Sequence, residues 1–176
     1  MKFFYNTLLT LLLFQCINKE KTIYKDEFIE VYFSNKYKIS KNKCPLPDCL
    51  QLINHEFLPS EAMIIDSGKF NENLNQWLEL GVQSLKNKKE IVVNEVVDQS
   101  ENCQKALIIF KSDYKDINTE RIGLQLSSIS LIKTKEFSRG IYWRHILTNN
   151  IENLPLLQKG LESVIRATLI NAKCIE

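Results

Sequence analysis

The sequence predicts an α/β (α+β) domain built as a two-layer sandwich, in which a mostly antiparallel sheet of about five strands carries two amphipathic helices on one face. Three observations lead to this prediction. Runs rich in β-branched and aromatic residues recur along the chain, two segments repeat apolar residues at three- and four-residue steps, and two of the last strands are joined by a short turn.

The first third of the domain is predicted to contain short strands. Residues 28–33 form a β-rich run, whereas residues 34–48 are polar and lysine-rich and are typical of a loop. Two further short strands are expected at 50–57 and 62–65, separated by Pro59.

A helix is predicted over residues 71–88, where Leu74, Leu78, Gly81 and Leu85 share one face. The glycine on that face should let a neighbouring element approach closely, at some cost in helix propensity. The β-branched run 91–97 then predicts a strand. The continuously apolar run 106–110 predicts a strand that is covered on both faces.

A long hairpin and a second helix are predicted to complete the domain. Apolar residues alternate from Ile122, and the alternation changes phase at Ser127-Ser128, which predicts a β-bulge. Residues 134–140 form a turn, and alternation resumes over 141–147. Helical spacing of apolar residues then begins at Leu154 and continues to the C-terminal region.

The N-terminus has the composition of an export signal. Lys2 precedes a short apolar run over residues 8–14, which is too short to cross a bilayer as a stable helix. A buried core helix is the alternative, but the run is apolar all round and gives way at once to charged residues. We therefore expect residues 1–15 to be a signal peptide.

Leu13-Phe14-Gln15-Cys16 resembles the lipobox of bacterial lipoproteins, in which the cysteine thiol is acylated and becomes the new N-terminus. Phe14 and Gln15 depart from the usual small residues, a looseness that spirochaete lipoproteins tolerate. The resemblance implies lipidation at Cys16, a tether over 16–26, a single domain over 27–176, and a lipid-anchored place in the cell envelope, at the outer membrane facing the periplasm or the surface. An ordinary secreted protein is the alternative.

The four remaining cysteines predict two disulfides, because exported proteins fold under oxidising conditions. Sequence leaves three pairings open, and we prefer Cys44 with Cys49 and Cys103 with Cys174. The two prolines between Cys44 and Cys49 favour a local turn. Free thiols are an alternative, whereas the spacing does not match a zinc site or a thioredoxin-like redox pair.

No residue pattern predicts catalysis, a metal site or a cofactor. The formal net charge of +2 is interspersed along the chain, which is unlike a nucleic-acid binder. His55-Glu56 lacks the second histidine of a metalloprotease, and no serine elbow or phosphate-binding glycine loop is present. His145 shares a strand face with Trp143, so we expect a packed histidine rather than a general base.

Three residues near the hairpin are candidates for a protein interface. Tyr142, Arg144 and Arg139 are of the types that anchor such interfaces. Alternation places Tyr142 and Arg144 on the face opposite Trp143. An ordinary solvated sheet face is the alternative interpretation.

The order of elements over residues 70–170, with Ser128-Ile129-Ser130-Leu131-Ile132, the turn at Gly140 and Ile141-Tyr142-Trp143, is similar to the periplasmic lipoproteins of the CsgG, LpoB and TolB-N-terminal-domain type. That resemblance implies a non-catalytic binding or assembly role, with the membrane and an envelope protein as partners. A periplasmic carrier of an apolar ligand or lipid is the alternative function.

Overall fold

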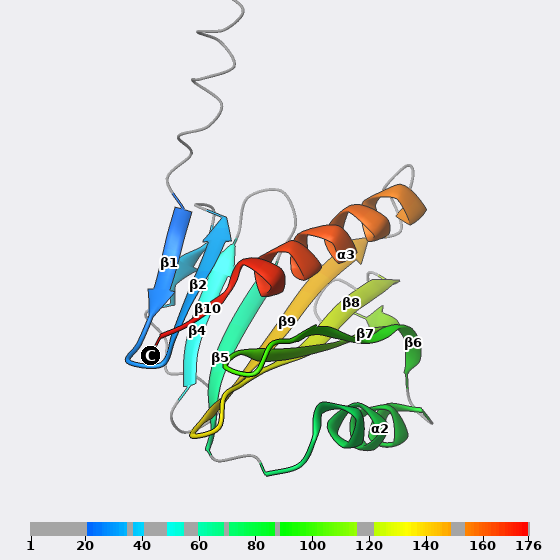
Figure 1. Cartoon of the computed structure of the whole chain (residues 1–176). Helices are drawn as coiled ribbons and strands as arrows, with labels where there is room; N and C mark the ends of the chain where they lie inside the picture. The colour runs from blue at the N-terminus through cyan, green and yellow to red at the C-terminus, as the bar shows by residue number, and fades with distance from the viewer. Residues whose placement is uncertain are drawn as a thin grey trace, which may run out of the picture.

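The computed structural model of the protein describes residues 21–34, 37–40, 49–54, 60–68, 71–86, 89–115, 122–148 and 154–175. These residues form two antiparallel sheets and two helices (Figure 1). The small sheet has the order β1-β2-β10, and the large sheet has the order β3-β4-β5-β9-β8-β7-β6. The elements are β1 (Lys21–Lys25), β2 (Ile29–Ser34), β3 (Lys38–Ile39), β4 (Cys49–Asn54), β5 (Ser60–Gly68), α2 (Leu74–Leu85), β6 (Glu90–Gln99), β7 (Gln104–Lys115), β8 (Ile122–Lys133), β9 (Ser138–Thr148), α3 (Leu154–Asn171) and β10 (Lys173–Cys174).

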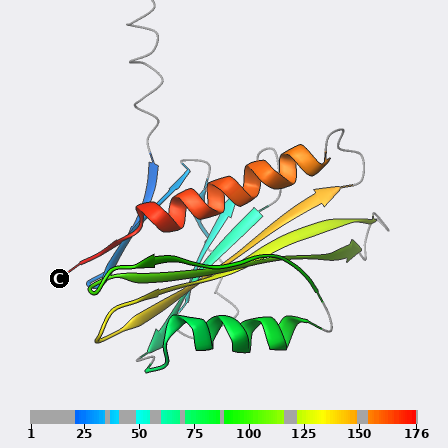
Figure 2. The same ribbon diagram turned by 45° about the vertical axis from the view of Figure 1, so that its right-hand side comes forward.

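The two helices cover opposite faces of the large sheet. On β7, Leu107 and Ile109 pack in one core cluster with Ile165 of α3, whereas Ala106 and Ile108 pack in a second cluster with Leu78 of α2. Figure 2 shows the two helices on opposite sides of the long strands. Because side chains alternate along a strand, an unbroken apolar run must be covered from both sides.

The predicted fold class is therefore wrong. The protein is mostly β, with a seven-stranded sheet and a separate three-stranded sheet in place of one sheet of about five strands, and its helices do not share a face. The helix positions were predicted well, but amphipathic periodicity tells which side of a helix is buried and not which side of a sheet buries it. The run 106–110 already required two covering layers.

The predicted β-bulge at Ser127-Ser128 is also wrong, since β8 pairs with β7 and β9 without a register shift. Leu126 lies on the α3 side of the sheet, and Leu131 lies on the α2 side. The apolar residues change phase because the covering layer changes along the strand. Where the phase changes, the small side chains of Ser127 and Ser128 are buried, one on each face of the sheet.

The small sheet packs on the α3 side of the large sheet. Ile29, Val31 and Phe33 of β2 are buried in the same core cluster as Ile165 of α3. Strand β1 begins at Lys21, inside the range 16–26 that the sequence analysis assigned to a tether. The described part of the fold therefore begins before residue 27.

Local sequence signals for α2 agree with its structure. Asn73 is the N-cap, and it forms a reciprocal capping box with Gln76. The predicted close approach at Gly81 is confirmed, because a Cβ added there would collide with the side chain of Ile108. This contact brings α2 down onto β7.

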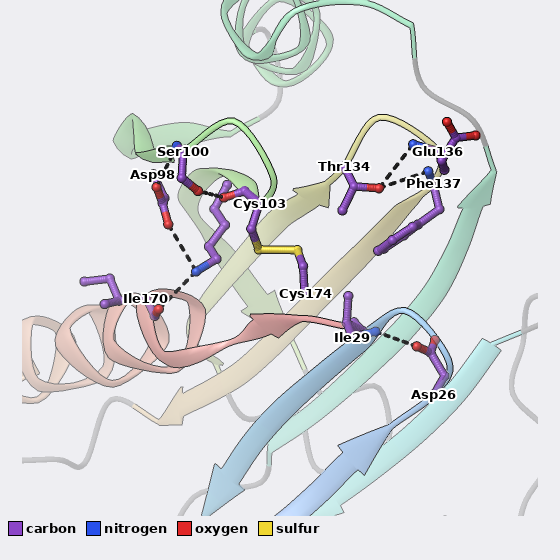
Figure 3. Close-up of a disulfide and its surroundings, with 11 residues drawn as sticks. Asp26, Ile29, Asp98, Ser100, Cys103, Thr134, Glu136, Phe137, Ile170 and Cys174 are labelled. Atoms are coloured by element: carbon purple, nitrogen blue, oxygen red, sulfur yellow. Dashed lines mark hydrogen bonds and ion pairs between the residues drawn. A yellow bond between two sulfur atoms is a disulfide. The ribbon is translucent and has the colours of Figure 1, made fainter. Parts of the chain in front are cut away.

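A disulfide joins Cys103 in the β6–β7 turn to Cys174 in β10, as the close-up in Figure 3 shows. This is the pairing that the sequence analysis preferred. The buried Lys105 reinforces the link, since its Nζ donates to the Ile170 carbonyl at the end of α3 and lies 3.3 Å from an Asp98 carboxylate oxygen. Cys44 and the side chain of Cys49 lie outside the described residues, and so does His55.

Candidate functional site

On the α2 side, the described residues cover the large sheet only in part. Helix α2 packs against β6 and β7, so the same side of β4, β5 and β9 extends beyond it. We call this surface the open face. Its side chains follow from the strand register, in which Met63 lies beside Tyr142 and Glu61 lies beside Arg144. The open face comprises Gln51, Glu61, Met63, Ile65, Gln125, Tyr142, Arg144 and Ile146.

A row of polar side chains crosses the open face. The Glu61 carboxylate accepts a hydrogen bond from Gln51 Nε2 at 3.0 Å and pairs with Arg144 Nε at 2.8 Å. The Arg144 side chain remains 40% exposed, so its guanidinium can reach a further partner. Towards α2, the hydroxyls of Ser127 and Tyr142 lie 3.3 Å apart.

Apolar side chains surround this polar row. Met63, Ile65, Ile146 and Tyr142 are all half-buried, and Tyr142 also packs against the α2 core cluster. An apolar surface that carries a few oriented polar groups, including Arg and Tyr, has the composition of a protein-binding patch. As predicted from alternation, Tyr142 and Arg144 lie on the face opposite the buried Trp143.

Arg139, a predicted interface residue, is buried and links parts of the fold. Its side chain is only 9% exposed, and it pairs with Asp26 at 3.0 Å and with Asp66 at 2.8 Å. The guanidinium also lies 4.8 Å from the centre of the Phe28 ring and 5.7 Å from that of Phe137. Arg139 therefore joins the small sheet to β5 and β9, and the proposed interface is better placed at Tyr142 and Arg144.

Asp26 is the central carboxylate of this junction. Partial burial by itself would raise its pKa, but backbone N–H groups of Ile29 and Phe28 and the Arg139 guanidinium together hold the pKa of Asp26 below its usual value. Burial, followed by the hydrogen bond to Asp26, raises the pKa of Tyr24 to about 12. Asp26 thus stays ionised around neutral pH, whereas the Tyr24 hydroxyl stays protonated.

His145 is a packed histidine on the α3 side. It is 4% exposed, its ring meets that of Trp143 edge-on at 6.3 Å, and burial lowers its pKa to about 4. Its Nε2, the Nε1 of Trp143 and the hydroxyl of Ser128 are buried and have no hydrogen-bond partner among the described residues. These groups face the core, where an external substrate does not reach them.

Other features of the described residues add no chemistry. Over these ranges no group of three or more histidine, cysteine or acidic side chains converges as a metal site would require. Neither described helix combines the length and apolar character needed to cross a bilayer. A pocket of about 360 Å³ lies at the turn end of the sheet, between Phe28, Phe137 and Ile175.

No protein-family model and no curated protein matches the sequence. The fold is similar to solved structures. A point mutant of the protein Mog1 aligns with a TM-score of 0.60 at 10% identity, over 91% of this chain and 97% of the other. LpqN, described as involved in cell envelope biogenesis of Mycobacterium tuberculosis, aligns with a TM-score of 0.52 at 8% identity, over 92% of this chain and 94% of the other.

At these identities the comparisons show a shared fold. Neither neighbour is a CsgG, LpoB or TolB protein by name, so that resemblance gains no support here. The sequence did not single out Glu61, the partner of Arg144, or Gln51, which donates a hydrogen bond to Glu61. Their strands could be expected from alternation, but the pairing of β5 with β9 brings together residues far apart in the chain.

Proposed function

We propose that this protein is a lipoprotein of the bacterial cell envelope, anchored through Cys16, which binds another envelope protein through its open face without catalysing a reaction. The observation that carries the binding role is the row of Gln51, Glu61 and Arg144 on a sheet face that α2 leaves uncovered. The groups in this row are held by one another, so they are oriented before a partner arrives. Such preorganisation reduces the entropy lost on binding.

The anchor is supported by the N-terminal sequence, and an envelope role agrees with what is described for one structural neighbour. The order of Lys2, the apolar run 8–14 and Cys16 matches an export signal followed by an acylation site. LpqN, which has a similar fold, is described as taking part in envelope biogenesis. Several acyl chains on one cysteine would hold the protein on a membrane stably, whereas one chain binds only marginally.

Packing on the α3 side gives no support to the alternative of an apolar-ligand carrier. Leu107, Ile109 and Ile165, which fill the space between the large sheet and α3, are at most 1% exposed. A carrier of this architecture would need room at that position for its ligand. The pocket near Phe28 and Phe137 lies at the turn end instead.

Metabolic labelling with a fatty acid tests the anchor. Cells expressing the native chain should incorporate labelled palmitate into the protein, and cells expressing Cys16→Ser should not. The mature native protein should also begin at Cys16 by mass spectrometry. A native protein that retains residues 1–15, or that lacks fatty acid, would contradict the proposal.

Affinity capture with two matched arginine variants tests the binding role. Arg144 and Arg166 each pair with one glutamate through Nε, at 2.8 and 2.9 Å, and their side chains are 40% and 47% exposed. We expect Arg144→Glu to lose a stoichiometric partner from solubilised envelope and Arg166→Glu, on α3, to retain it. Equal recovery by both variants would argue against the open face.

A further inference from the structure

The outward side of α3 carries an unusual concentration of exposed apolar side chains. Among the described residues, six large hydrophobic side chains are exposed, and three of them lie on α3: Leu156 at 72%, Val164 at 53% and Ile170 at 52%. At about 100° per residue, these positions fall on one side of the helix, opposite the buried Ile165 and Leu169. A single exposed leucine needs no explanation, but three on one helix face do.

Charge on α3 is compatible with an anionic surface. Glu162 is the only acidic residue of the helix, and it lies on the flank rather than on the outward side. Small residues, Gly160, Ser163 and Ala167, separate the apolar ones. Beside the helix, Tyr32, Val164 and Lys173 contribute to a groove of about 420 Å³. The Lys173 side chain is 67% exposed.

The position of β1 indicates what this surface meets. Strand β1 starts at Lys21, five residues after Cys16. An extended chain spans at most about 3.5 Å per residue, so a lipid-anchored Cys16 holds the start of β1 within about 17 Å of its attachment point. Helix α3 has 18 residues at about 1.5 Å each, so it is about 27 Å long, which is more than the tether can span.

The start of β1 and α3 lie on the same side of the molecule. In Figure 2, β1 (blue) begins on the side where α3 (orange to red) lies, and α2 (green) is on the opposite side. Figure 1 shows the same relation. A short tether from this side brings the apolar surface of α3 to the bilayer.

We propose that the outward side of α3, through Leu156, Val164 and Ile170, lies in the headgroup region of the phospholipid bilayer that holds the Cys16 anchor. This inference rests on the proposed lipidation. Three partly exposed side chains alone would bind a membrane weakly, but the anchor makes their contact intramolecular and raises their effective concentration. The domain then has a fixed orientation, with the open face directed away from the lipid.

Quenching of tryptophan by brominated acyl chains tests this orientation. The acylated full chain is placed in phosphatidylcholine–phosphatidylglycerol vesicles, in a Trp77→Phe background, with either Leu156→Trp or Leu80→Trp. Leu80 is 55% exposed on α2 and serves as the matched control, and the buried Trp143 supplies a common baseline. We expect quenching of Leu156→Trp to exceed that of Leu80→Trp roughly threefold, since an interfacial helix buries its apolar side near the acyl chains.

The outcomes separate the two proposals. If the acylated chain floats with the vesicles but Leu156→Trp is quenched no more than Leu80→Trp, the orientation is wrong and the anchor stands. If the purified chain carries no fatty acid and does not float, the proposed lipid anchor is wrong, and the proposed orientation of α3 is then wrong too. Protein crosslinks from position 156 that displace lipid would also overturn the inference.

Discussion

The two sides of the seven-stranded sheet differ in how they are covered. On one side, α3 and the small sheet are fixed to the sheet by a disulfide, by Lys105 and by the Arg139 junction. On the other side, α2 covers β6 and β7 and leaves the open face. The links that stabilise the fold thus lie on the α3 side, whereas the α2 side retains polar groups that are held in place and are still accessible.

The largest loss of stability should come from removing the disulfide. Replacing Cys103 and Cys174 by alanine opens a loop of 71 residues and should lower the free energy of unfolding by about 4 kcal/mol in the chain-entropy estimate. Urea unfolding of the native protein and the double variant measures this. An unchanged midpoint would mean that the α3 side does not depend on its crosslink.

Variants of the two arginines of β9, Arg139 and Arg144, compare how much each side of the sheet contributes to stability. Arg139→Met leaves Asp26 partly buried without its cation and should lower the free energy of unfolding by about 3 kcal/mol. Arg144→Met removes a guanidinium that is 40% exposed, and Glu61 keeps its hydrogen bond from Gln51, so this change should cost only about 1 kcal/mol. Chemical denaturation of both variants provides the measurement, and equal losses would contradict the assigned roles.

Acid should lower the stability of the folded protein through His145, which is buried on the α3 side. Burial lowers its pKa to about 4 in the folded protein, against about 6.5 in the unfolded chain. The unfolded state therefore binds the proton first as pH falls, so stability is complete above pH 6.5 and is lost towards pH 4. This group should account for about 2 kcal/mol of loss between pH 7 and pH 5.

His145→Leu is the control for that pH dependence. Leucine has a similar volume and removes the unpartnered Nε2, so the variant should remain folded at pH 7. Its free energy of unfolding should fall less than that of the native protein between pH 7 and pH 5. Parallel pH profiles for the two proteins would show that His145 is not the responsible group.

Local patterns in the sequence predicted many elements of this fold. Apolar spacing located α2 and α3, a β-branched run located β6, a continuously apolar run located β7, and alternation placed Tyr142 opposite Trp143. These features depend on neighbours within a few residues, where periodicity is informative. Lipidation at Cys16 is also predicted from local sequence, and it remains a prediction.

The sequence did not predict which layer covers which residues. Arg139 looked available for an interface, but its partners Asp26 and Asp66 lie 113 and 73 residues away in the chain. The phase change in β8 looked like a bulge because the switch of covering layer from α3 to α2 is a tertiary feature. Periodicity reports that a side chain is buried, whereas only topology tells what buries it.

Site-specific photo-crosslinking in intact cells tests most directly whether the two sides have different roles. A benzophenone amino acid is placed at Met63 on the open face, at Leu156 on α3 or at Leu80 on α2. We expect a discrete protein adduct from Met63 only, and a lipid adduct from Leu156. Protein adducts from Leu156 with none from Met63 would contradict it.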